Sequence, residues 1–190
     1  MGSRAGEVSE QSVASAAPVS AASSGPPRTP WYVSGAPPRQ SLRVIVVETI
    51  ASLVALALVG ALTFVTHDPW LIPPFAASMA LVVGGAHFPL AQPRNVVGGH
   101  LASSIVGVLV GLIGMDALWA GALAGALALG AMKLLRMSHS PAAATAMIAV
   151  FPLVPRWEFV VMVGCAAMIL VAVGLVGNKV NGVRYPHYWW

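Results

Sequence analysis

Six apolar segments follow one another between residues 44 and 177, and this succession restricts the chain to a membrane fold. A helix that crosses a bilayer needs roughly 20 predominantly apolar residues. Four segments reach that length, namely 44–65, 96–115, 117–135 and 158–177, whereas 70–88 is borderline and 141–152 is too short to cross unaided. Only 8% of the residues are Asp, Glu, Lys or Arg, about a third of the share in soluble domains. We therefore predict an all-α membrane protein with four full-length and two short, proline-led helical segments.

The two ends of the chain differ from this apolar region. Residues 1–40 are rich in Ala, Ser, Pro and Gly, a composition typical of disordered tails. They contain no apolar run of secretory-signal length, and an organelle transit peptide is the alternative interpretation. Residues 183–190 contain Tyr and Trp side chains typical of anchors at membrane interfaces. The predicted organisation is thus a tail, a transmembrane domain over 41–182 and an aromatic C-terminal tail.

Two motifs recur in the same order along the apolar region. The first is a proline followed by small residues, with a hydroxyl residue in fifth place, and the second is a proline-led stretch that ends in arginine. The matching stretches are 74–79 with 141–146, and 89–94 with 152–156. We predict two three-helix repeats, 41–115 and 117–182, which would be inverted relative to one another because each crosses the membrane three times.

The placement of charges predicts the topology. If all six segments cross, one side receives a single basic residue, Arg156, beside the acidic Asp68, Asp116 and Glu158. The other side receives Arg39, Arg43, Arg94, Lys133, Arg136, Lys179 and Arg184. Because Lys and Arg collect on the cytoplasmic side, both termini are predicted to be cytoplasmic. The predicted location is a multi-pass protein of a bacterial plasma membrane, with a plastid envelope as the alternative.

The two proline-led motifs are the best candidates for a binding site. Proline is well placed in the first turn of a helix, and a helix that begins inside the membrane directs N–H groups and a positive dipole end into its surroundings. Ser78 and Thr145 would add hydroxyl groups, and the small Ala77 and Ala144 would leave the backbone amides accessible. Such a site suits a small anion. The alternative is that small residues simply allow helices to pack closely.

Three basic or ionisable side chains lie near these motifs. His139 directly precedes the second motif, and His100 lies about one turn inside the third long segment, where an ionisable group is often functional. Arg94 could attract an anion electrostatically, or it could anchor a cytoplasmic loop at the lipid headgroups. We predict that His139 contacts the ion and that Arg94 and His100 attract it.

Other classes of function find little support in the residues. No Cys, His and acidic residues share metal-ligand spacing, and neither a nucleophile elbow nor a Walker-type phosphate loop is present. No basic stripe indicates nucleic-acid binding. We therefore expect no enzyme activity, no cofactor and no metal. The expected partners are the lipid bilayer, a small anion and, as a possibility, a second copy of the chain. Small-residue spacings such as Gly107 with Gly111 allow close helix contact either within one chain or between two copies.

Taken together, these motifs resemble the HPP family of small integral membrane proteins over about residues 40–178. The resemblance rests on the stretches 71–78, 91–100 and 139–146, of which 91–100 is the most specific. Ser140 stands where the first proline of the family's His-Pro-Pro sequence is usual, and Ala76 and Ala143 stand where glycine is common. Some family members from plastids and cyanobacteria are associated with nitrite transport, so the resemblance implies a site for that anion.

The resulting expectation is a transporter or channel for a small monovalent anion, with nitrite as the first candidate. The alternative is a membrane scaffold or partner subunit that transports nothing. A third possibility is a proton or cation carrier that uses Glu48 and the histidines.

Overall fold

The computed structural model describes residues 36–151 and 156–189. Most of the predicted N-terminal tail, residues 1–35, lies outside the described residues, as does the second proline-led stretch 152–155. Residues from Gln40 onward form one compact unit, separate from the unit that ends at Arg39. Of that first unit only 36–39 are described, and they are exposed and not helical.

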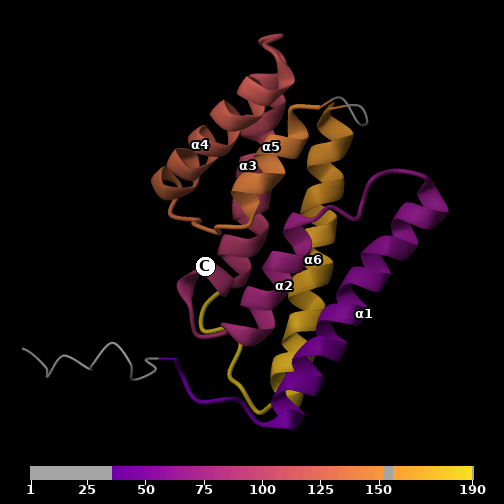
Figure 1. Cartoon of the computed structure of the whole chain (residues 1–190), viewed down its shortest axis with the longest axis vertical. Coiled ribbons are helices and arrows are strands. Elements are labelled where there is room, and N and C mark those ends of the chain that lie inside the picture. Colours follow the sequence, from indigo (N-terminus) through magenta and orange to yellow (C-terminus); the bar gives the residue numbers. More distant parts are fainter. Residues whose placement is uncertain (1–35, 152–155, 190) are drawn as a thin grey trace, which may run out of the picture. The chain divides into compact units, whose positions relative to one another are not determined.

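The unit is all-helical in its described residues, as predicted (Figure 1). Its six α-helices and one 3₁₀ turn, η1, follow each other along the chain in the order α1 Leu42–Thr66, α2 Pro74–Gly84, η1 Pro89–Ala91, α3 Pro93–Gly111, α4 Ala117–Leu134, α5 Ala142–Ala149 and α6 Arg156–Val180. Helices α1, α4 and α6 are long and apolar enough to span a membrane.

Local sequence explains where several helices begin. The Ser41 hydroxyl accepts a hydrogen bond from the Val44 amide at the start of α1, and the Asp116 carboxylate accepts one from the Leu118 amide at the start of α4. Helix α2 begins at Pro74, and α5 begins directly after Pro141. Proline suits the first turn of a helix, where its missing N–H is not needed, and this agrees with the start of both short helices at a proline.

The helical parts of the two short segments are too short to cross a bilayer. Helix α2 has 11 residues and α5 has 8, so they rise about 16 and 12 Å, against roughly 30 Å of hydrocarbon. The two short, proline-led helices expected from the sequence are therefore present, and the passage of these two segments across the bilayer stays a prediction. Each is a half-length helix preceded by a non-helical connection, residues 67–73 before α2 and 135–141 before α5.

The first turns of the two short helices lie side by side and point in opposite directions (Figure 1). Helix α2 runs from the middle of the unit toward the end where α1 starts and α6 finishes, and α5 runs toward the opposite end. The Arg43 guanidinium donates to the Val180 carbonyl over 3.2 Å, which ties the start of α1 to the end of α6. Both ends of the helical unit thus lie on one side.

Helix packing follows a regular pattern. Helices α3 and α6 pack against each other at the centre, α1 packs against α2 and α6, and α4 packs against α5 and α3. Exchanging α1 with α4, α2 with α5 and α3 with α6 maps the α3–α6 pair onto itself and each of the other pairs onto a second pair in the set. An inverted repeat would produce this pattern, and the repeat itself stays a prediction.

Glycines allow α5 to approach its neighbours closely. A Cβ atom at Gly107 on α3 would collide with the Ala146 carbonyl oxygen and lie 2.7 Å from the Ala149 Cβ. A Cβ at Gly125 on α4 would lie 3.1 Å from the Met147 Cγ. These small-residue positions therefore serve contacts between helices of the same chain.

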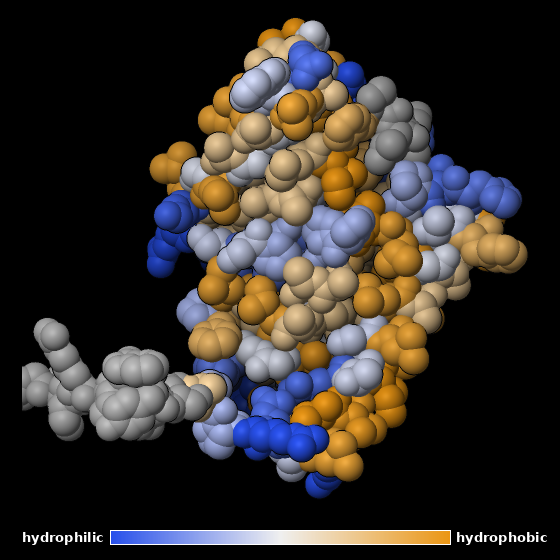
Figure 2. Space-filling model, in the orientation of Figure 1, coloured by the Kyte–Doolittle hydropathy of each residue, from blue (hydrophilic) through white to orange (hydrophobic). Residues whose placement is uncertain are grey.

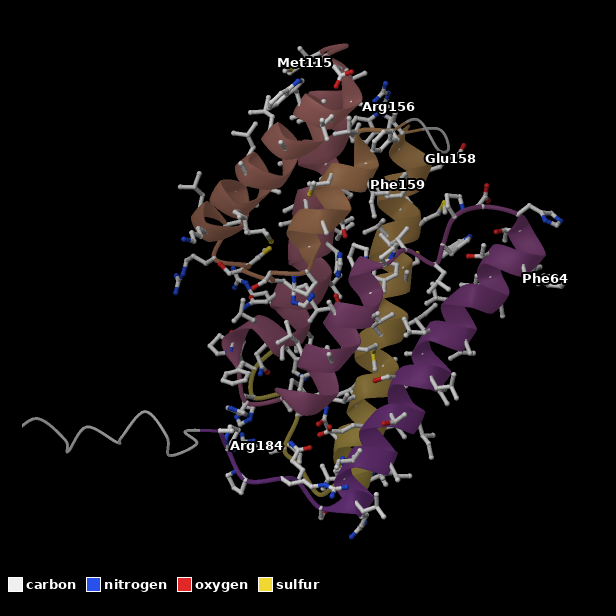
Figure 3. All side chains as sticks on the ribbon, viewed as in Figure 1. Phe64, Met115, Arg156, Glu158, Phe159 and Arg184 are labelled. Atoms are coloured by element: carbon white, nitrogen blue, oxygen red, sulfur yellow. The ribbon has the colours of Figure 1, made fainter. Side chains whose placement is uncertain are left out.

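The outer surface of the unit is largely apolar, as a bilayer requires. Figure 2 shows hydrophobic side chains along the outer face of α1, where Leu53 and Leu58 are exposed. Figure 3 places Arg156 and Glu158 at one end of the unit and Arg184 at the other. These three charged side chains thus lie at the two ends of the unit.

Candidate functional site

Four polar side chains meet where α2 and α5 begin. Ser78 comes from α2, His100 from α3 and Thr145 from α5, and His139 lies in the connection between α4 and α5. None of the four has any exposed surface. Their residues are up to 67 positions apart in the sequence (145 − 78), so only the fold brings them together. We call these four side chains the polar cluster.

Hydrogen bonds connect the polar cluster into one chain. The Ser78 Oγ lies 2.8 Å from the Nε2 of His100 and 2.8 Å from the Nε2 of His139. The His100 Nδ1 lies 2.9 Å from the Thr145 Oγ1. At the other end, the His139 Nδ1 lies 2.7 Å from the Leu90 carbonyl oxygen. Each imidazole therefore has a partner on both ring nitrogens.

The Leu90 carbonyl fixes the direction of this chain. A carbonyl can only accept, so the His139 Nδ1 carries a proton, and in the neutral imidazole its Nε2 accepts from the Ser78 hydroxyl. The Ser78 hydroxyl also lies 3.1 Å from the Pro74 carbonyl, so its one proton goes either there or to His139. When it goes to His139, the Ser78 oxygen accepts from the Nε2–H of His100, whose Nδ1 then accepts from the Thr145 hydroxyl. With both histidines neutral in this arrangement, every bond in the chain runs from Thr145 toward Leu90.

Apolar groups surround the polar cluster. The ring of Phe75 meets that of His100 in a T-shaped contact, with 5.1 Å between centroids and 66° between planes. The two imidazole centroids are also 5.1 Å apart. Phe75 and Met79 are fully buried beside Ser78 on α2. In such an environment hydrogen bonds are strong and an unpaired polar group is costly.

The backbone amides predicted to bind the anion are already bonded. The Phe75 and Ala76 amides donate to the carbonyls of Ile72 and Pro73, each over 3.1 Å. The first amides of α5 donate in the same way to the carbonyls of residues 139–141, over 3.0–3.2 Å. These tight turns satisfy N–H groups that an isolated helix would leave free. In this structure the amides after Pro74 and Pro141 are therefore not free, and their predicted part in binding an anion stays a prediction.

The fold brings together four of the seven predicted site residues. Ala77 and Ala144 are exposed and direct their methyl groups away from the buried polar cluster. Arg94 is half-buried at the start of α3, where it donates to the Leu135 carbonyl over 3.4 Å. It precedes His100 by six residues, a rise of about 9 Å along the helix. Arg94 is therefore not part of the polar cluster.

Sequence reasoning missed the groups that hold Leu90 in place. The fully buried Gln92 donates to the Ala86 and Phe88 carbonyls over 2.8 and 3.0 Å, and its Oε1 accepts from the His187 amide over 2.8 Å. The Tyr185 hydroxyl donates to the Ala91 carbonyl over 2.9 Å. The only signal in the sequence is that Gln92 belongs to the specific stretch 91–100.

Tyr185 was predicted to be an interfacial anchor, but it packs against the protein instead. Its ring lies against the hydrophobic core, and burial raises the pKa of its hydroxyl, which therefore stays protonated and donating. Replacing Tyr185 by Phe is expected to lower the unfolding free energy by about 1 kcal/mol, because the Ala91 carbonyl loses its partner. Unfolding by denaturing detergent would measure this, with Tyr188→Phe, at a more exposed position, as the control. Equal effects from both changes would contradict the assigned role.

Metal-binding groups do not cluster in the described residues. Within 36–151 and 156–189, no three His, Cys, Asp or Glu side chains come close enough to hold a metal ion. The two imidazoles and two hydroxyls of the polar cluster can form hydrogen bonds and exchange protons.

Comparison with known proteins agrees with this architecture. Two transmembrane proteins of Dictyostelium discoideum are 37% and 40% identical to this chain, over 63% and 64% of its length. The matches cover 45% and 42% of the relatives, so the chain spans less than half the length of either. No solved structure matches. The family described as "HPP, transmembrane region" matches residues 37–186, a stretch that contains all six helices and the whole polar cluster. This chain therefore belongs to the HPP family of membrane proteins.

Proposed function

We propose that this protein lets a small monovalent anion, nitrite first, pass through the membrane. The observation that supports this most is the polar cluster itself, a buried set of donors without a carboxylate at the point where two half-length helices begin. Substrate sites of many transporters lie near the bilayer midplane between such broken helices. No Asp or Glu occurs in α2, α3, α5 or the 135–141 connection. No carboxylate in these elements would therefore repel an anion.

The hydrogen bonds of the cluster indicate how an anion would bind. In this structure the four side chains satisfy one another, so an entering anion has to replace at least one of these bonds. Ser78 and Thr145 can turn their O–H groups toward it, and a protonated imidazole can donate from both ring nitrogens. A flat anion with two oxygens, such as nitrite, can accept from two of these donors at once.

The charge distribution supports an orientation as well. Arg43 and Lys179 lie at the end of the unit where α1 starts and α6 finishes, and Arg184 lies there too (Figure 3). We propose that this end faces the cytoplasm, in keeping with the preference of basic residues for that side. Modification of a cysteine placed near the C-terminus by a membrane-impermeant reagent, in vesicles of known sidedness, would test it.

Uptake of nitrite into proteoliposomes tests the proposed function. The purified protein should raise the rate well above that of empty vesicles. Equal rates with and without protein would contradict transport and favour the alternative, a scaffold or partner subunit that transports nothing.

Thr145→Val should weaken uptake while the protein still folds. The change removes the hydroxyl that bonds the His100 Nδ1 and keeps a side chain of similar size. A lost hydrogen bond of about 1 kcal/mol corresponds to a roughly fivefold weaker interaction. Thr49→Val on the lipid-facing side of α1 is the matched control, since the Thr49 hydroxyl bonds only within its own helix. If both variants carry nitrite equally well, Thr145 has no part in the site.

A further inference from the structure

The polar cluster contains no permanent positive charge to balance an anion. Helices α2 and α5 have no ionisable side chain, Lys133 and Arg136 are exposed at the end of α4, and Arg94 contacts Leu135. A lone negative charge in an apolar interior is very costly. His100 and His139 are the only members of the cluster that can become positive, and each does so by taking up a proton.

We propose that one proton travels with each anion, held on the His100–Ser78–His139 chain, so that the passage is electrically neutral. This inference rests on the proposed function and specifies the ion that accompanies the substrate. An anion beside an imidazolium forms a neutral pair, and their attraction offsets part of the cost of placing the anion in the protein interior.

The hydrogen-bond geometry provides a path for that proton. A proton added to the Nδ1 of His100 makes this ring an imidazolium. Its Nε2–H proton then passes to the Ser78 Oγ, while the Ser78 O–H proton passes to the Nε2 of His139. One N–H and one O–H bond break, and one O–H and one N–H bond form. His139 becomes the imidazolium and His100 returns to neutral.

The hydroxyl in the middle of the path is well placed for this exchange. Both transfers occur across 2.8 Å contacts, a normal hydrogen-bond length. The Leu90 carbonyl, which accepts from His139, stabilises the protonated ring at the end of the path. The charge can therefore move between the α3 side and the α4–α5 connection without a change in the fold.

Few other ionisable groups face the two histidines. Among the described residues, α2, η1 and α5 have none, and the remaining groups come from helices packed around the cluster or from the segment after α6. These groups are Arg94 on α3, Lys133 on α4, Arg136 after it, Arg156, Glu158, Cys165 and Lys179 on α6, and Arg184, Tyr185, His187 and Tyr188 after α6. The four ring nitrogens of the two histidines are bonded to Ser78, Thr145 and the Leu90 carbonyl.

Proteoliposomes that enclose a pH-sensitive dye test the proposal. The experiment applies a nitrite gradient at mildly alkaline pH, where little nitrous acid diffuses through lipid, and compares each trace with empty vesicles. We expect the lumen to acidify by one proton per nitrite taken up. We also expect that valinomycin with equal potassium on both sides leaves the rate unchanged, because no charge accumulates.

The other outcomes separate the two proposals. Nitrite uptake that valinomycin accelerates, with no acidification linked to it, would overturn proton coupling and leave anion transport standing. Absence of protein-dependent nitrite uptake would overturn both. Both outcomes are measured on the wild-type protein, so the test does not depend on whether a variant folds.

Glutamine variants then locate the proton. His139→Gln can still donate to the Leu90 carbonyl but cannot bind a proton, and His100→Gln is the equivalent change at the other end of the path. Both are expected to lose nitrite-driven acidification at least tenfold, about 1.4 kcal/mol. His87→Gln, in an exposed loop, is the control and should acidify like the wild type. Normal acidification by both cluster variants would overturn the assignment to these two rings.

Discussion

Nitrite flux is expected to fall roughly 10- to 100-fold when Ser78 is replaced by Ala, because a hydrogen bond to a charged group contributes about 1.5–3 kcal/mol. The Ser78 hydroxyl joins the two histidines through 2.8 Å contacts on both sides. Its removal leaves two imidazole nitrogens buried without a partner and interrupts the chain in the middle. Initial rates of nitrite uptake into proteoliposomes, at equal amounts of folded protein, would measure the effect.

Ser103→Ala is the matched control for this change. Ser103 is also fully buried, on α3, but its hydroxyl has no hydrogen-bond partner among the described residues. Its loss should leave both flux and stability nearly unchanged. If the two alanine variants transport nitrite at the same rate, the polar cluster is a packing feature and the proposed site is wrong.

Gly107→Ala is expected to lower the unfolding free energy by about 3 kcal/mol, because overpacking a tight contact forces the backbone to shift. The added methyl group would meet the carbonyl oxygen of Ala146 and lie 2.7 Å from the Ala149 Cβ. The obstacle is the backbone of α5, which cannot rotate away as a flexible side chain can. Unfolding in denaturing detergent, followed by circular dichroism, would measure the loss.

Gly130→Ala provides the comparison, since nothing lies within 4 Å of a Cβ at that position on α4. Alanine there should stabilise the protein by about 0.5–1 kcal/mol, since glycine is less favourable within a helix. The two identical substitutions are thus expected to have opposite signs. A stabilising or neutral Gly107→Ala would show that α3 and α5 are not in the close contact described above.

The sequence predicted the helices well, because apolar runs and proline positions are local signals. All six helical segments were anticipated, and so was a proline at the start of each of the two short ones. The polar cluster was partly predictable too, because ionisable or hydroxyl residues are uncommon in such runs. Four residues chosen for that reason, Ser78, His100, His139 and Thr145, do meet in the fold.

The remaining features of the site depend on distant contacts. Nothing near His139 in the sequence indicates that its partner is the Leu90 carbonyl, 49 residues away. Free amide donors were expected from general helix geometry, but the turns before α2 and α5 tighten and use those N–H groups locally. Arg94 was included on charge alone, and its place on the helix sets it more than a turn away from His100. The sequence pattern identifies which residue types could form a site. The directions in which their side chains point depend on how the helices pack.

The packing of the helices has a consequence for how the site could open. Helices α1, α2 and α6 contact one another, and so do α3, α4 and α5, so the unit consists of two three-helix bodies that meet mainly along α3 and α6. Ser78 belongs to the first body, and the two histidines and Thr145 lie with the second. A small rotation of one body on the other would therefore break only the two Ser78 bonds inside the cluster, at about 1–3 kcal/mol in total. The Ser78 hydroxyl would thus connect the two bodies when the cluster is closed, and loss of its two hydrogen bonds would let the bodies separate at the cluster.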